Sequence, residues 1–186
     1  MSPAERDTFL ATLVDELRTA WLKLRGAHGA ERFYSFGVYT TALAEYLMVT
    51  ASTEEGLNAV VADYQQKYGG DPVRQRASLR WSPCDSPLHL EGEALLPLTS
   101  ELREQLPDPY QDCPQSDAAI EAVFEIAVQA LKRLDEEGLF GAGDERARLV
   151  LSVWKGDQSD EERVAFARLL NSASVADAFE RELAAG

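Results

Sequence analysis

Cysteine and histidine are both scarce in this chain of 186 residues, with two of each. Two cysteines are too few for a disulfide framework, and as they lie 29 positions apart they do not supply the ligand spacing of a zinc site. The N-terminal segment lacks the basic and apolar blocks of a secretory signal. We therefore expect reduced thiols, a cytoplasmic location, and no bound metal or cofactor.

Long hydrophobic runs are also missing. The most apolar stretch, FYSFGVYTTALAEYLMVTA at residues 33–51, is interrupted by Glu45 and contains several tyrosines and threonines. A membrane-spanning helix needs about 20 predominantly apolar residues. The sequence therefore predicts no membrane span.

Positive charge is in short supply, because 18 lysines and arginines face 32 aspartates and glutamates, for a net charge of −14. Such a field repels nucleic acids and anionic membranes, and it attracts basic protein surfaces. More than half of the excess lies in residues 111–186, which hold 16 acidic and 8 basic residues. Two interpretations stay open: the acidic surface keeps the protein soluble, or it binds a basic partner.

Helix signals are the clearest feature that is present. Ser2 and Glu5 form a capping-box pattern that begins a helix ending near residue 25, and Ser52 and Glu55 repeat the pattern for a second helix. A long amphipathic helix is predicted near 117–137, followed by Gly138 as its stop. Shorter helices are expected at 99–106, 159–170 and 174–183.

Strand signals occur at four places. Residues 32–40 and 45–52 are rich in aromatic and β-branched residues and predict two adjacent antiparallel strands. Gly37 within the first marks a bulge or a close backbone approach. Further strands are expected at 76–81 and at 147–154. We therefore predict a single α+β domain over residues 1–186, with helices packed on a mostly antiparallel sheet of about four or more strands.

Cys84 and His89 are the only pair that suggests nucleophilic catalysis. They lie five residues apart in a segment with several prolines, and this spacing does not establish the contact that a thiol and its base require. His28 is expected in an exposed loop. Trp81 is predicted to be a core residue at the end of a strand, and Arg80 to point the other way and pair with a carboxylate. No catalytic residue is assigned.

The glycine-rich segment GLFGAGDER, residues 138–146, raises the question of a phosphate-binding loop. It follows a helix instead of a strand, lacks the lysine and hydroxyl of a nucleotide loop, and carries Asp144 and Glu145, which would repel phosphate. Gly138 is better explained as a helix stop. The acidic run at 157–162 lacks the alternating ligands and central glycine of a calcium loop.

The pieces FYSFGVYTT, TEEGL, LRWSPCD and LDEEGLFGAGDERARLVLSVWKGD resemble, in order and spacing, a bacterial family of domains of unknown function. The resemblance covers roughly residues 5–170. Its most specific parts contain Arg80 and Trp81 in RWSP, and Gly138 and Gly141 in the later glycine motif. The family brings no established activity. Its members look like small proteins encoded near polymorphic-toxin and immunity genes, which implies an immunity role.

We therefore expect a non-enzymatic immunity protein that binds a basic toxin domain. The expected partner-binding carboxylates flank the strand at 147–154 in two sets, which that strand could separate: Glu136, Glu137, Asp144, Glu145, Asp157, Asp160, Glu161 and Glu162. Two alternatives stay open, namely a small enzyme that uses Cys84 and His89 or a carboxylate cleft, and an acidic adaptor subunit. The identity of the toxin, the oligomeric state and the strand order do not follow from the sequence.

Overall fold

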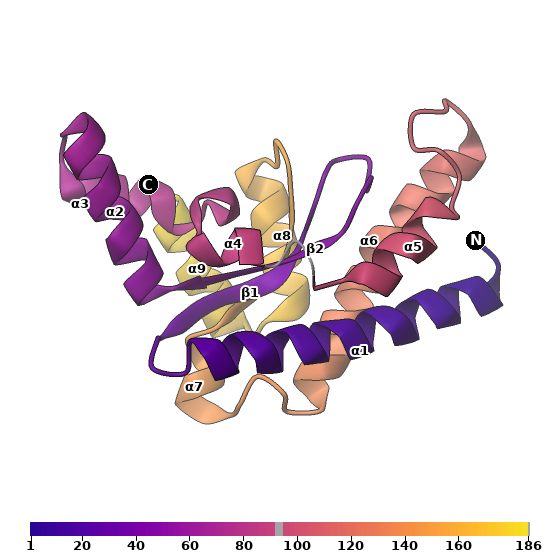
Figure 1. Cartoon of the computed structure of the whole chain (residues 1–186), viewed down its shortest axis with the longest axis horizontal. Coiled ribbons are helices and arrows are strands. Elements are labelled where there is room, and N and C mark those ends of the chain that lie inside the picture. The colour runs from indigo at the N-terminus through magenta and orange to yellow at the C-terminus, as the bar shows by residue number, and fades with distance from the viewer. Residues whose placement is uncertain (92–94, 186) are drawn as a thin grey trace.

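The computed structural model describes residues 1–91 and 95–185. Helices predominate, and they surround a small central sheet (Figure 1). None of the described helices is long and apolar enough to cross a bilayer. In chain order the elements are α1 (Pro3–Ala27), β1 (Phe33–Thr40), β2 (Met48–Thr53), α2 (Glu54–Tyr68), α3 (Pro72–Arg80), the 3-10 turn η1 (Pro83–Asp85), α4 (Pro87–Glu91), α5 (Pro97–Glu104), α6 (Pro114–Glu136), α7 (Gly143–Ala147), β3 (Val150–Lys155), α8 (Asp160–Leu170) and α9 (Ala173–Leu183).

The sheet of the described residues has three strands in the order β2-β1-β3. β1 pairs with β2 in antiparallel register, as predicted, with Phe36 opposite Ala51. β3 pairs with β1 in parallel register, with Phe36 opposite Leu151. The prediction of a mostly antiparallel sheet of four or more strands is therefore wrong. The long, mainly helical connection between β2 and β3 allows β3 to enter parallel to β1, which a tight hairpin could not do.

The strand expected at residues 76–81 is part of a helix instead. Asp71 caps α3 by accepting a hydrogen bond from the backbone N–H of Val73, and Pro72 occupies the first turn, where a proline costs no hydrogen bond. After Val73, residues 74–80 contain no β-branched residue to oppose the helix. Trp81, the C-cap, is buried as predicted, although it ends a helix and not a strand.

Side-chain caps also mark the starts of α1, α2 and α8. Ser2 with Glu5 and Ser159 with Glu162 form complete capping boxes at α1 and α8. The second helix differs from the prediction, because Thr53 and not Ser52 is its cap and accepts from the N–H of Gly56 at 3.0 Å. The long helix α6 begins at Pro114, slightly before the predicted start, and ends at Glu136.

Both faces of the sheet are covered. On one face, Phe36, Leu151 and Val153 belong to a core cluster that includes the buried stripes of α1 and α6. On the other face, Trp154 and Tyr34 pack with residues of α2, α3 and α9. The strand predicted at 147–154 is confirmed as β3, and both of its faces are buried. This two-sided burial explains why the strands read as nearly continuous apolar runs.

Gly37 marks a close backbone approach, as predicted. A Cβ built at this position would lie 1.9 Å from the carbonyl oxygen of Ser152 on the neighbouring strand β3. Carbon and oxygen cannot approach that closely, so any larger residue would have to push β1 and β3 apart.

Gly138 ends helix α6, as predicted, and its φ is +76°. The residues that follow bring Phe140 into the core against Trp21, with ring centroids 5.2 Å apart.

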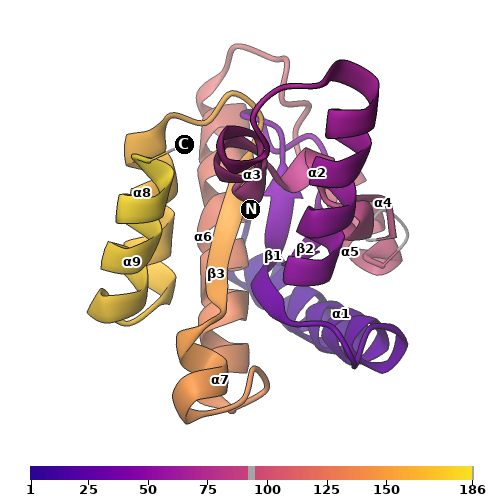
Figure 2. The ribbon, with the colours of Figure 1, turned by 90° about the vertical axis from the view of Figure 1, so that its left-hand side faces the viewer.

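The outer edge of β3 is closed by two side-chain amides. Asn171 accepts from the N–H of Leu151 at 3.0 Å and donates to its carbonyl oxygen at 2.8 Å, as a neighbouring strand would. Gln158 donates to the carbonyl oxygen of Val153 at 3.3 Å. α8 and α9 lie along this side of β3, away from β1 (Figure 2). These side chains and the two helices therefore cover the edge and protect it from pairing with another chain.

Candidate functional site

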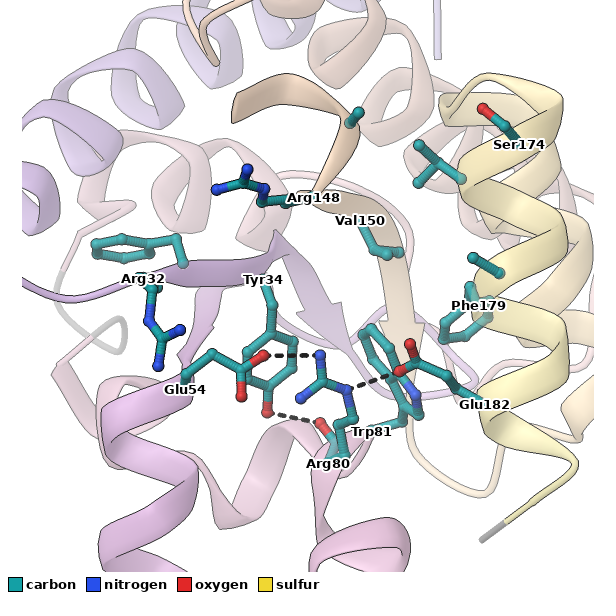
Figure 3. A pocket seen from close by; sticks show the side chains of 14 residues that line it. Arg32, Tyr34, Glu54, Arg80, Trp81, Arg148, Val150, Ser174, Phe179 and Glu182 are labelled. Carbon is teal, nitrogen blue, oxygen red and sulfur yellow. Dashed lines mark hydrogen bonds and ion pairs between the residues drawn. The ribbon is translucent and has the colours of Figure 1, made fainter. Parts of the chain in front are cut away.

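A pocket of about 610 Å³ opens beside the sheet, between the start of β1, the end of α3 and the face of α9 (Figure 3). This volume is in the range of small-molecule sites. Val150 of β3 and Phe179 of α9 belong to its apolar lining. Its charged lining consists of three arginines and two glutamates, namely Arg32, Arg80, Arg148, Glu54 and Glu182.

Arg80 is the centre of the charged network. Its Nη2 donates to Glu54 of α2 at 2.8 Å, and its Nε donates to Glu182 of α9 at 2.7 Å. Its guanidinium also lies over the ring of Tyr34, 4.3 Å from the centroid. Arg76 binds the second oxygen of Glu54. The network therefore joins α2, α3 and α9 around β1 (Figure 3).

Arg80 and its carboxylate partners keep one another charged, because each stabilises the charged form of the other. Burial alone would raise the pKa of Glu54, but the hydrogen bond and charge of Arg80, together with the charge of Arg76, keep it below its usual 4.5. Burial works against the charge of Arg80, yet Glu54 and Glu182 raise its pKa above its ordinary value. Burial also raises the pKa of Tyr34 to about 12, and its hydroxyl donates to the carbonyl oxygen of Arg80 at 2.7 Å. At neutral pH Arg80 and Glu54 are charged and Tyr34 is neutral.

The predicted carboxylate partner of Arg80 is confirmed, although both partners come from helices. Arg80 also bonds through its own carbonyl to Tyr34 on β1, so the end of α3 is fixed to the sheet. Trp81 follows directly, is 6% exposed, and packs edge-on to Phe179 with ring centroids 4.7 Å apart. The RWSP motif therefore links α3 to β1, α2 and α9, and its arginine lines the pocket.

Cys84 and His89 both lie beside Tyr39, whose ring packs edge-on to that of His89 with centroids 4.9 Å apart. Cys84 is exposed on η1, where its thiol lies against the hydroxyl of Tyr39, and this contact is the main reason for the raised pKa of that tyrosine. His89 is buried on α4, and its Nδ1 lies 3.2 Å from the hydroxyl of Thr50. His28 lies in the loop directly after α1, as predicted, but the expected exposure is wrong: it is partly buried, and its two ring nitrogens contact Glu31 and Glu91.

The glycine-rich segment serves a structural purpose. Gly141 has a φ of +87° and lies in the turn between α6 and α7. Arg146 folds back to bind both carboxylate oxygens of Asp135, at 2.5 and 2.9 Å, and also donates to Asn171. Among the residues that the structure describes, no group of three or more histidines, cysteines and carboxylates is arranged to hold a metal ion.

The eight carboxylates expected to bind a partner do not form one surface. Glu136, Glu137, Asp144 and Glu145 lie around the turn before β3, and the other four lie after it, at the opposite end of the strand; Figure 2 shows β3 between α7 and the chain that leads to α8. Four of the eight already pair with a cation of this chain. The pairs are Glu137 with Arg18 and Arg133, Glu145 with Arg25, Asp160 with Arg163, and Glu162 with Lys155.

A stronger concentration of negative charge lies on α5, the loop after it and the first turns of α6. We call this surface the acidic end. It consists of six exposed carboxylates that make no ion pair with any described residue: Glu101, Glu104, Asp108, Asp112, Asp117 and Glu121. The only basic residue nearby in sequence, Arg103, is buried and donates to the carbonyl oxygen of Ala44. The acidic end lies opposite α2 and α3 in the molecule (Figure 1).

A signal for the acidic end was present in the sequence. Residues 81–131 contain 10 acidic residues and a single basic one. The acidic excess of residues 111–186 includes only part of this stretch, because its other part lies before residue 111. The burial of Arg103, which removes its charge from the surface, could not be read from the sequence.

Comparison with known proteins identifies a family and no activity. No curated protein and no solved structure matches the chain. A family model described as "Domain of unknown function (DUF4303)" matches residues 13–172, which is most of the chain and includes the pocket arginines. The resemblance to an uncharacterised domain family is thereby confirmed. The chain belongs to the DUF4303 family of domains of unknown function.

Proposed function

We propose that this protein is a non-enzymatic binding protein that neutralises a basic bacterial toxin domain by direct contact, as an immunity protein does. The observation that carries the proposal is the acidic end, where six carboxylates face solvent without a counter-ion among the described residues. The fold accounts for two of them only in part: Asp108 accepts from the backbone N–H of Tyr110, and Asp117 lies in the first turn of α6. None of the six is neutralised by an ion pair with a described residue. Together they create a field that a basic surface lowers by binding.

A groove beside the acidic end supplies the apolar contact that affinity requires. It has a volume of about 680 Å³ and runs between α1 and α5, with Ala11, Leu95 and Leu98 in its lining. Leu98 is 55% exposed, so its side chain is accessible to an apolar side chain of a partner. Charged contacts set the rate and direction of approach, whereas apolar anchors in such a groove slow dissociation.

The predicted C-terminal carboxylates are the second choice for the interface. They are divided between the two ends of β3, and half of them are already neutralised by cations of the chain. A carboxylate that already has a partner must exchange one ion pair for another, so it gains less from binding. The acidic end has no such cost.

Affinity capture of the protein encoded by the adjacent gene tests the proposal. The tagged protein is mixed with that gene product at about 50 mM and 500 mM salt, and the dissociation constant is measured at both. We expect binding that weakens by at least about tenfold at high salt. Absence of binding at either salt concentration would contradict the proposal.

Two variants that each remove four charges locate the surface. The first carries Glu101→Gln, Glu104→Gln, Asp108→Asn and Asp112→Asn. The matched control carries Glu136→Gln, Asp144→Asn, Asp157→Asn and Glu161→Gln, four carboxylates that likewise make no ion pair with the described residues. We expect the first variant to weaken binding and neutralisation much more than the control. Equal losses would show that only the net charge matters and would overturn the assignment to the acidic end.

A further inference from the structure

The pocket beside Arg80 carries positive charge within a protein of net charge −14. Three arginines and two glutamates line it, so its local balance is opposite in sign to that of the molecule. An acidic surface is easily explained by solubility, but a cavity that gathers arginines against this background is not. We propose that this pocket is a binding site for a small organic oxyanion, a carboxylate or phosphate carried on an apolar body.

The two glutamates do not block an anion, because both are held by arginines on one side of the pocket. Glu54 receives Arg76 and Arg80, and Glu182 receives the Nε of Arg80. Their charges are therefore offset within the network. On Arg80, Nη1 donates no hydrogen bond to any described residue, so part of its donor capacity remains unused.

Arg148 supplies the positive charge that faces a ligand. It is exposed and makes no ion pair or side-chain hydrogen bond with any described residue. It lies across the pocket from the Arg80 network, and its guanidinium points away from Ser174, toward the side on which Arg32 lies (Figure 3). Arg32 lines the same opening, with its side chain 72% exposed and its Nε directed to Glu55. Guanidinium groups approaching from separate elements suit a planar carboxylate or a phosphate, which accepts several donors at once.

The N-terminus of α9 adds to this arrangement. Its N-cap, Ser172, makes no side-chain cap bond, so the first N–H groups of this eleven-residue helix are not satisfied by that cap. Ser174, in the first turn, lines the pocket. Helix N-termini favour negative charge. Val150 and Val175 form an apolar wall beside it, and this wall accommodates the body of the ligand.

Binding of two model anions tests the proposal. Phenyl phosphate and 3-phenylpropanoate present the two candidate oxyanions on similar apolar bodies, and 2-phenylethylammonium is the cationic counterpart. Two-dimensional amide NMR spectra of the full-length protein are recorded during each titration. We expect at least one anion to shift the amide signals of Ser174, Val150 and Arg148, and the cation to leave them unchanged. Which anion binds more tightly distinguishes a phosphate ligand from a carboxylate ligand.

Arg148→Gln provides the decisive variant, because this side chain makes no contact that the fold needs. We expect it to weaken anion binding by about tenfold, the loss expected for one partly exposed charge-assisted hydrogen bond. Lys132→Gln, at an exposed position on α6, is the matched control for loss of one positive charge and should bind as the wild type does. Anion shifts that are absent, equal shifts with the cation, or equal weakening in both variants would each overturn the proposal.

Discussion

Replacing Arg80 by methionine should remove the ion pairs that link α3 to α2 and α9, while keeping an apolar stem of similar length. The side chains of Arg80 and Glu54 are each 20% exposed, and the hydrogen bond between them contributes about 2 kcal/mol. The bond to Glu182 is half exposed on the glutamate side and contributes about 0.5 kcal/mol. Loss of the contact with the ring of Tyr34 adds about 0.5 kcal/mol.

The expected loss for Arg80→Met is therefore about 3 kcal/mol in the free energy of unfolding. Urea titration followed by circular dichroism measures it, with an unchanged slope showing that the folded state is otherwise intact. Glu182→Gln should lose only about 0.5 kcal/mol, because half of its side chain is in water. In a double-mutant cycle with Glu54→Gln, the coupling energy should be about 1.5 kcal/mol. A loss below about 1 kcal/mol for Arg80→Met would refute the reasoning.

Three further changes test the scaffold. Gly37→Ala should destabilise the protein by about 3 kcal/mol or prevent folding, because the new Cβ meets a carbonyl oxygen of β3; a urea midpoint equal to wild type would contradict this. Asn171→Ala should cost about 2 kcal/mol by leaving both polar groups of Leu151 at the strand edge without their partner, and faster amide hydrogen exchange at Leu151 would locate the effect. Hydrogen bonding to Glu31 raises the pKa of His28, so this contact should stabilise the fold below pH 6.5 and lose its effect as the pH rises through the folded-state value. Between pH 6 and pH 8.5 the unfolding free energy of the wild type should therefore decrease relative to that of His28→Gln; a constant difference would show that the histidine does not titrate with folding.

Much of the fold could be predicted where the signal is local. Ser2 with Glu5 places the start of α1, and Gly138 places the end of α6, because caps and stops act within one helical turn. The same logic applied to Asp71 and Pro72 would have placed α3. The pattern of residues 76–81 alone favours a strand, and the cap that starts the helix lies five residues before it.

The sheet and the pocket depend on contacts between distant parts of the chain. The parallel pairing of β3 with β1 is fixed by packing on both faces, and periodicity within β3 carries no information on its partner. Arg80 was expected to find a carboxylate, but its partners lie 26 and 102 positions away. No spacing rule links such residues, so a pocket built from them becomes visible only in three dimensions.

The association rate constant with the protein encoded by the adjacent gene, measured as a function of ionic strength, tests the central claim most directly. If the acidic end guides binding, the rate constant of the wild type should decrease steeply with added salt, and the four-charge variant of the acidic end should show a slower rate and a shallower dependence. The matched C-terminal variant should stay close to the wild type. A rate constant that is independent of salt, or that changes equally in both variants, would contradict the account.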